Sequence, residues 1–137
     1  MSTGTKSSMG KLKDNEPKKR TKLFHGEPPS EVIKCAEILK NDSSPMLSTA
    51  ILQSILSCTI SYIQNERSAE KSFHTILETY DNNDKIILVT IFTGFYLILK
   101  ETIRIKLSIL ILQTDLILLE IPNHIISLLI SSLLSYY

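Results

Sequence analysis

The sequence predicts a mainly α-helical protein, with a disordered basic N-terminal arm followed by a small bundle of five or six helices. Residues 1–22 carry seven Lys and Arg against two acidic residues. From residue 31 to residue 80, apolar residues recur with helical spacing between segments rich in Asn, Asp, Ser and Pro. Residues 107–137 contain no Lys or Arg and only two acidic residues, so this stretch must be buried against something.

We expect three parts: a disordered arm over residues 1–30, a helical domain over 31–106, and an apolar helical tail over 107–137. The arm has too few large hydrophobic residues to offset the entropy of ordering it. Its first 22 residues sum to +5 (seven minus two) and the remainder to −4 (eight minus twelve). No basic field covers the whole chain, so nucleic acid is an unlikely partner.

The first two helices are marked by caps and by a break between them. Ser30 is the expected N-cap of a short helix over residues 31–40. A run of Asn, Asp, Ser and Pro then breaks the chain, and Ser44 and Pro45 suit the cap and first position of the next helix, 45–64. The apolar face expected for this second helix consists of Leu47, Ile51, Ile55, Cys58 and Tyr62.

The third helix has the clearest two-sided pattern. It is expected over residues 68–80 with Ser68 as its cap. Its solvated face carries Glu70, His74 and Glu78, which we interpret as surface and not as metal ligands because no second element supplies a partner. Its apolar face consists of Ala69, Phe73, Ile76, Leu77 and Tyr80.

The next segment is ambiguous between helix and strand. Residues 86–99 are uncharged and rich in β-branched and aromatic side chains, and residues 103–109 alternate between apolar and polar. A helix over 84–106 is favoured, because three helices precede it and no turn signal follows the apolar run. The alternative is an α+β domain with strands within residues 86–112.

The C-terminal stretch is apolar over 107–121, is broken at Pro122, and forms a last helix over 125–137 with Asn123 as cap. Ser127, Ser131 and Ser135 lie four apart, a pattern of small residues that lets two helices approach closely. The large apolar residues of this helix have no charged neighbours to keep it soluble alone. They are Ile126, Ile130, Leu133 and Leu134. We therefore expect the tail to form a homo-oligomer if its own domain leaves it uncovered.

The sequence gives little support for catalysis or for cofactor binding. Cys35 and Cys58 fall on apolar helix positions, where thiols are buried and inert, and they form no dense disulfide framework. No nucleophile motif, phosphate-binding Gly-rich loop or paired acidic motif is present. We expect no catalytic residue, no metal and no cofactor, and interpret the protein as a non-enzyme.

The basic arm contains the strongest short motif. Lys18, Lys19, Arg20 and Lys22 have the spacing of a monopartite nuclear-import signal, which an import receptor binds in an extended conformation. Together with the apolar helices, this predicts a non-enzymatic helical module for protein–protein interaction. Its expected location is the nucleus or the cytoplasm.

Two alternatives stay open. The first is a membrane-associated protein, anchored in an intracellular membrane by its apolar C-terminal third. A spanning helix needs about 20 apolar residues, and the fourteen of 86–99, between Lys85 and Lys100, are too few. The second alternative is a truncated or alternative form of a larger helical protein with a non-native tail.

Overall fold

The computed structural model describes residues 20–41 and 47–137, and the protein is mainly α-helical, as predicted. Within the described residues the helices are α2 (Ser30–Asn41), α3 (Thr49–Ile63), α4 (Ala69–Leu77), α5 (Asn82–Ile105), α6 (Ile109–Leu118) and α7 (Asn123–Tyr136). The alternative with strands within 86–112 is wrong, because α5 and the start of α6 occupy these residues.

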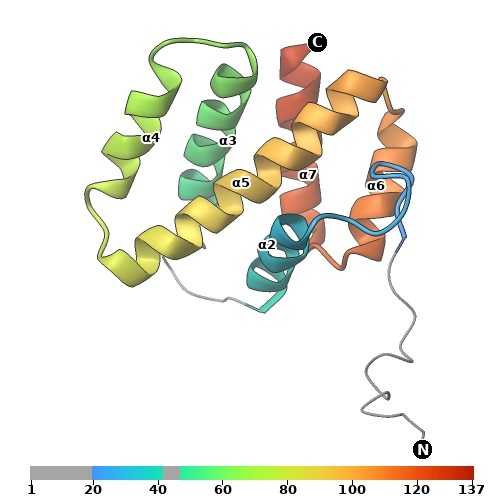
Figure 1. Ribbon diagram of the computed structural model, residues 1–137, viewed down its shortest axis with the longest axis horizontal. Helices are drawn as coiled ribbons and strands as arrows, with labels where there is room; N and C mark the ends of the chain where they lie inside the picture. The colour runs from blue at the N-terminus through green and yellow to red at the C-terminus, as the bar shows by residue number, and fades with distance from the viewer. Residues whose placement is uncertain (1–19, 42–46) are drawn as a thin grey trace, which may run out of the picture.

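Helix α5 is the longest element and organises the bundle. It crosses diagonally in front of α3 and α7, while α2 packs on it and α6 lies on the far side of α7 from α4 (Figure 1). Helix α3 also packs against α4 and α7, and α6 packs against α7. These contacts surround one continuous core.

The last third of the chain belongs to this core. Leu112 and Leu116 of α6, and Leu129 and Leu133 of α7, are fully buried in the same cluster as α2, α3 and α5. The expected division into a helical domain and a separate tail at residue 107 therefore differs from the packing. Part of the apolar surface of the tail is thus covered by its own chain, whereas Leu110, Ile117, Leu118, Leu134 and Tyr137 are exposed.

Residues 20–29 are also part of the folded protein, although the arm was expected to run to residue 30. Thr21 and Gly26 exchange two backbone hydrogen bonds of 2.7 and 2.9 Å, which close a turn. Leu23, at the tip of this turn, has 0 % of its surface exposed, and its N–H donates to Oδ2 of Asp115 at 2.8 Å. One buried leucine and one buried acceptor thus fix the segment. The expectation for residues 1–19 lies outside the described residues.

The helix expected over 84–106 is confirmed, and the residues at its two ends explain where it begins and where it ends. The Asp81 carboxylate accepts the N–H of Asp84 at 2.9 Å, so α5 begins at residue 82. Lys106 adopts the left-handed conformation, with φ of 55°, and ends the helix. Tertiary packing of the buried side overrides the strand preference of the β-branched residues.

The first residues of the helices and their N-caps were predicted least accurately from the sequence. Helix α3 begins after Ser48, whose side chain accepts the N–H of Ile51, and the expected cap Ser44 lies outside the described residues. Ser68 precedes α4 but makes no capping hydrogen bond. Asn123 is the first residue of α7, not its cap, because Pro122 occupies the cap position.

Replacing Ser48 with alanine is expected to lower the free energy of unfolding by about 1 kcal/mol, because one N-terminal amide of α3 loses its acceptor. Ser68→Ala is the matched control, since Ser68 makes no capping bond. It is expected to change stability by less than about 0.5 kcal/mol. Urea unfolding measures both, and equal losses in the two variants would contradict the assigned cap.

Candidate interaction surface

The outer side of α5 carries an exposed apolar surface, which we call the α5 stripe. Ile86 and Val89 are 65 % and 42 % exposed. Thr93 and Leu97, both half-buried, continue the row at helical spacing, on the side opposite buried residues such as Leu88 and Phe95. The stripe is defined by Ile86, Val89, Thr90, Thr93 and Leu97.

The two threonines of the α5 stripe add little polarity to it. The hydroxyl of Thr90 donates to the carbonyl oxygen of Ile86, and that of Thr93 donates to the carbonyl oxygen of Val89, both at 2.8 Å. Both hydroxyl protons are therefore used within the helix. Residues 86–99 also contain no charged residue. The exposed side of α5 is therefore more apolar than the presence of two threonines would indicate.

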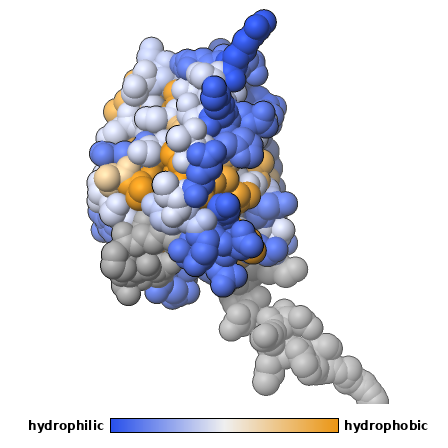
Figure 2. Space-filling model, turned by 90° about the vertical axis from the view of Figure 1, so that its left-hand side faces the viewer, coloured by the Kyte–Doolittle hydropathy of each residue, from blue (hydrophilic) through white to orange (hydrophobic). Residues whose placement is uncertain are grey.

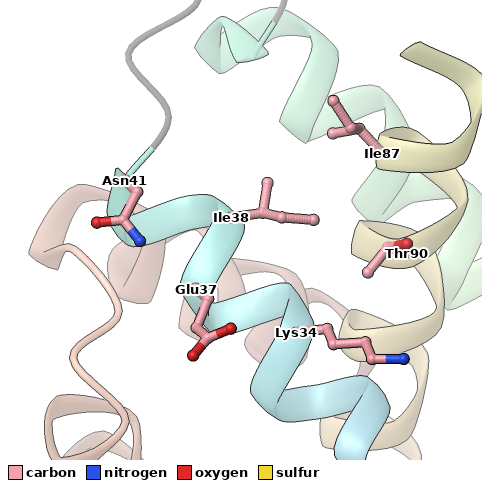
Figure 3. Close-up of a pocket in the computed structure, with 6 residues that line it drawn as sticks. All are labelled: Lys34, Glu37, Ile38, Asn41, Ile87 and Thr90. Atoms are coloured by element: carbon pink, nitrogen blue, oxygen red, sulfur yellow. The ribbon is translucent and has the colours of Figure 1, made fainter. Parts of the chain in front are cut away.

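A groove runs beside the stripe, between α2 and α5. It has a volume of about 590 Å³ and is lined by Lys34, Glu37, Ile38, Asn41, Ile87 and Thr90. Ile38 and Ile87 point from the two helices into the space between them, and polar side chains border it (Figure 3). The groove thus combines an apolar middle with a rim that carries both signs of charge.

Hydrophobic surface is also visible on the side of the molecule where α4 and the start of α5 lie (Figure 2). Figure 2 shows a band of hydrophobic surface on the face formed by α4 and the start of α5, with hydrophilic surface above and below it. Such a rimmed band on a protein surface is typical of a binding site.

The chain segments before and after the α5 stripe differ in net charge, although Asp84 lies on the buried side of α5 with Leu88 and Phe95. Residues 78–85 contain Glu78, Asp81, Asp84 and Lys85, which sum to −2 (one minus three). Residues 100–106 contain Lys100, Glu101, Arg104 and Lys106, which sum to +2 (three minus one). At the basic end, Nε of Arg104 donates to Glu101 at 2.8 Å, and this hydrogen bond lowers the pKa of the Glu101 carboxyl.

The serine row on α7 meets α3 of the same chain. Ser131 and Ser135 line a groove of about 530 Å³ together with Ser57 and Ser61 of α3, whereas Ser127 is exposed and does not line it. Ser131 and Ser135 therefore border this groove together with α3 of the same chain, and the close helix approach expected from the pattern stays a prediction.

The apolar residues of α7 are largely covered. Ile126 and Leu133 are buried and Ile130 is half-buried, while Leu134 is 58 % exposed. Of these four residues, only Leu134 is left for a second copy to cover. Oligomerisation through the tail stays a prediction.

The folded turn includes two of the import-signal candidates. Arg20 and Lys22 flank Thr21, whose backbone N–H and carbonyl both pair with Gly26. A receptor that binds an extended backbone would have to open this turn. Lys18 and Lys19 lie outside the described residues.

The cysteines and the acidic face of α4 lie where the sequence placed them. Cys35 and Cys58 are both buried and unpaired as disulfides. Burial raises the pKa of the Cys35 thiol to about 12, and its Sγ donates to the carbonyl oxygen of Ile91.

Glu70 and His74 of α4, and Glu78 at its C-cap, are exposed. Among the described residues, no group of three or more His, Cys, Asp or Glu side chains could hold a metal ion.

One helix of the described part of the chain is long and apolar enough to cross a membrane. It is α5, with 24 residues, whereas α6 and α7 are shorter apolar helices. From the sequence, only the fourteen apolar residues 86–99 were counted, and these are too few to span a membrane. The helix itself is longer, because it continues past Lys85 and Lys100 at both ends. Length and composition alone give this result, and a core helix of a soluble protein can give it too.

The comparisons with known proteins add no relative. No family model, no curated protein and no solved structure matches this chain. The candidate surface is therefore assigned from the geometry and chemistry of the described residues.

Sequence reasoning missed the α5 stripe. Because residues 86–99 are uncharged on every side, their pattern did not distinguish the outer side of α5 from the buried one. A usable signal lies further along the helix: Lys100 and Arg104 stand seven and eleven residues after Thr93 and share its side.

Proposed function

We propose that this chain is a non-enzymatic module for protein–protein interaction, and that the α5 stripe with the adjoining groove is its docking surface. The observation that carries the proposal is the exposure of Ile86 and Val89 within an uncharged run of fourteen residues. Full burial of one such side chain is worth about 1.5–3 kcal/mol. Covering the stripe with a partner would therefore be favourable.

The shape of the surface fits a helical partner. Apolar side chains spaced three and four residues apart on one helix match the apolar face of a second, amphipathic helix. The groove beside them has Ile38 and Ile87 at its centre and Lys34 and Glu37 at its rim. This arrangement gives an apolar anchor site and polar groups that orient the partner.

The experiment is site-specific photocrosslinking in cells. A photoreactive amino acid at Val89 is expected to give protein adducts at least about fivefold above the same probe at Glu70, an exposed position of α4. Ile86→Lys should remove the adducts, because a charge would have to be buried in the interface.

Circular dichroism of the Ile86→Lys variant checks that its helices are intact. Equal adduct yields at positions 89 and 70, or adducts formed with lipid and not with protein, would overturn the proposed function. A lipid adduct would instead favour the membrane-associated alternative.

A further inference from the structure

We propose that the folded turn of residues 20–29 is an autoinhibitory latch, which withholds Arg20 and Lys22 from a receptor that binds basic segments in an extended conformation. Such a receptor offers an acidic groove, where carboxylates pair with Lys and Arg and the extended main chain forms hydrogen bonds. The latch lies apart from the α5 stripe, so its test does not depend on the proposed function.

The backbone of the basic segment is already used inside the turn. The N–H of Thr21 donates to the carbonyl oxygen of Gly26 at 2.7 Å, and the N–H of Gly26 donates to that of Thr21 at 2.9 Å. The Thr21 hydroxyl also donates to the carbonyl oxygen of Gly26 and accepts the N–H of Phe24, both at 3.2 Å. Thr21 lies between Arg20 and Lys22, so the backbone that an extended-chain receptor would contact is paired within the turn.

The turn also folds one of the basic side chains back on the chain. The backbone reverses at His25 and Gly26, which have φ of 57° and 145°. A Cβ atom at Gly26 would stand 3.1 Å from Nη2 of Arg20, so the guanidinium lies against this glycine. In an extended chain, Arg20 and Lys22 would instead project to the same side, because side chains alternate along such a chain. The closed turn and the receptor-bound segment are therefore incompatible conformations.

Burial of Leu23 holds the latch closed. This side chain is 0 % exposed, and its N–H donates to Oδ2 of Asp115, which is 4 % exposed in α6. Opening the turn removes the leucine from the core and takes the N–H away from its buried acceptor. Because only the open chain can bind, the affinity for the receptor falls by the fraction of chains in which the turn is open.

Binding of full-length chains to a purified nuclear-import receptor tests the latch. The probe is a receptor that binds monopartite basic signals in an acidic groove, and fluorescence anisotropy measures Kd. Leu23→Ala is expected to bind at least about tenfold more tightly than the wild type, and Asp115→Ala should change Kd in the same direction. Adding Lys22→Ala to Leu23→Ala should abolish the gain, because the receptor contacts Lys22.

Three results of this titration would overturn the latch. The first is a wild-type chain that binds as tightly as Leu23→Ala. The second is an absence of receptor binding by Leu23→Ala, which would show that the released segment is not a signal. The third is a gain that persists in the Lys22→Ala background, since the receptor would then bind elsewhere.

Leu56→Ala separates opening of the turn from a general loss of stability. Leu56 is 1 % exposed in α3, a helix that packs against α4, α5 and α7. Its truncation removes a buried leucine just as Leu23→Ala does, but its Kd for the receptor is expected to stay within about twofold of the wild type. Circular dichroism checks that both variants keep their helices. Equal gains in the two variants would assign the effect to unfolding and contradict the latch.

Amide hydrogen exchange follows the turn itself. The amides of Thr21, Leu23 and Gly26 are expected to be protected in the free chain and to exchange at least about tenfold faster when the receptor is saturating. Amides in the middle of α3 should not change. Protection that persists at the three turn amides in the complex would show that the receptor binds the closed turn.

Heparin distinguishes this latch from simple attraction between charges. As a polyanion, heparin binds through charge and does not require an extended backbone. Since Leu23→Ala leaves the net charge unchanged, its affinity for heparin is expected to stay within about twofold of the wild type. An equal gain in affinity for heparin and for the receptor would mean that exposure of charge, and not opening to an extended chain, causes the effect.

Discussion

Replacing Gly94 with alanine is expected to lower the free energy of unfolding by about 2–3 kcal/mol. Gly94 lies where α5 passes closest to α2. A Cβ atom at this position would stand 2.4 Å from Cβ and 2.6 Å from Sγ of Cys35, well inside van der Waals contact. The Cβ of Cys35 is fixed by its own helix and cannot rotate away. The two helices would have to separate.

The sign of this effect makes the measurement decisive. In a helix without a close neighbour, alanine is more favourable than glycine by about 1 kcal/mol. Urea unfolding of Gly94→Ala should therefore show a loss if the helices are in contact and a gain if they are not. A gain would contradict the observed packing of α2 on α5.

A second substitution tests the origin of the loss. Cys35→Gly removes both atoms that the new Cβ would meet, so the double variant Gly94→Ala with Cys35→Gly should be more stable than the sum of the two single effects predicts. We expect a favourable coupling of about 1–2 kcal/mol. Additive effects would place the strain elsewhere.

Replacing Leu23 with alanine is expected to cost about 2–4 kcal/mol, because the side chain is fully buried in the core. Lys22→Ala is the matched control in the same turn, since Lys22 is exposed. It should change stability by less than about 0.5 kcal/mol. If residues 20–29 were a solvated arm, both changes would be nearly neutral in urea unfolding.

Asp115 offers an independent measurement of the same docking. Asp115→Ala leaves the buried N–H of Leu23 without its acceptor, at a cost of about 1–3 kcal/mol. Because both residues hold one turn, their effects are expected to be less than additive in the double variant. Full additivity would show that Asp115 acts apart from Leu23.

The helical class could be predicted because local patterns determine it, whereas α5 was only favoured over strands because three helices precede it and no turn signal follows its apolar run. The spacing of Ala69 and Phe73 in α4 is such a signal, because the residues that produce it lie within a few positions of one another. Of the apolar face expected for the second helix, Ile55 and Cys58 are buried, while Leu47 and Ile51 are half-buried.

The remaining features depend on residues that are distant in sequence. Leu23 stands among basic and polar residues and gave no periodic signal, and its acceptor Asp115 looked like an interruption of an apolar run. Their contact joins positions 92 residues apart. Similarly, Tyr62 was expected on the buried side of α3 but is 43 % exposed, because the buried side of that helix includes Leu52 and Leu56.

The contact between Leu23 and Asp115 also has a consequence for synthesis on the ribosome. The segment around Leu23 is made about 90 residues before its docking site on α6. At about 5–20 residues per second, the early segment therefore waits for several seconds or more without its binding site. During that time Leu23 lacks its buried site and is open to chaperones that bind apolar segments, and the turn can dock only after α6 has been made.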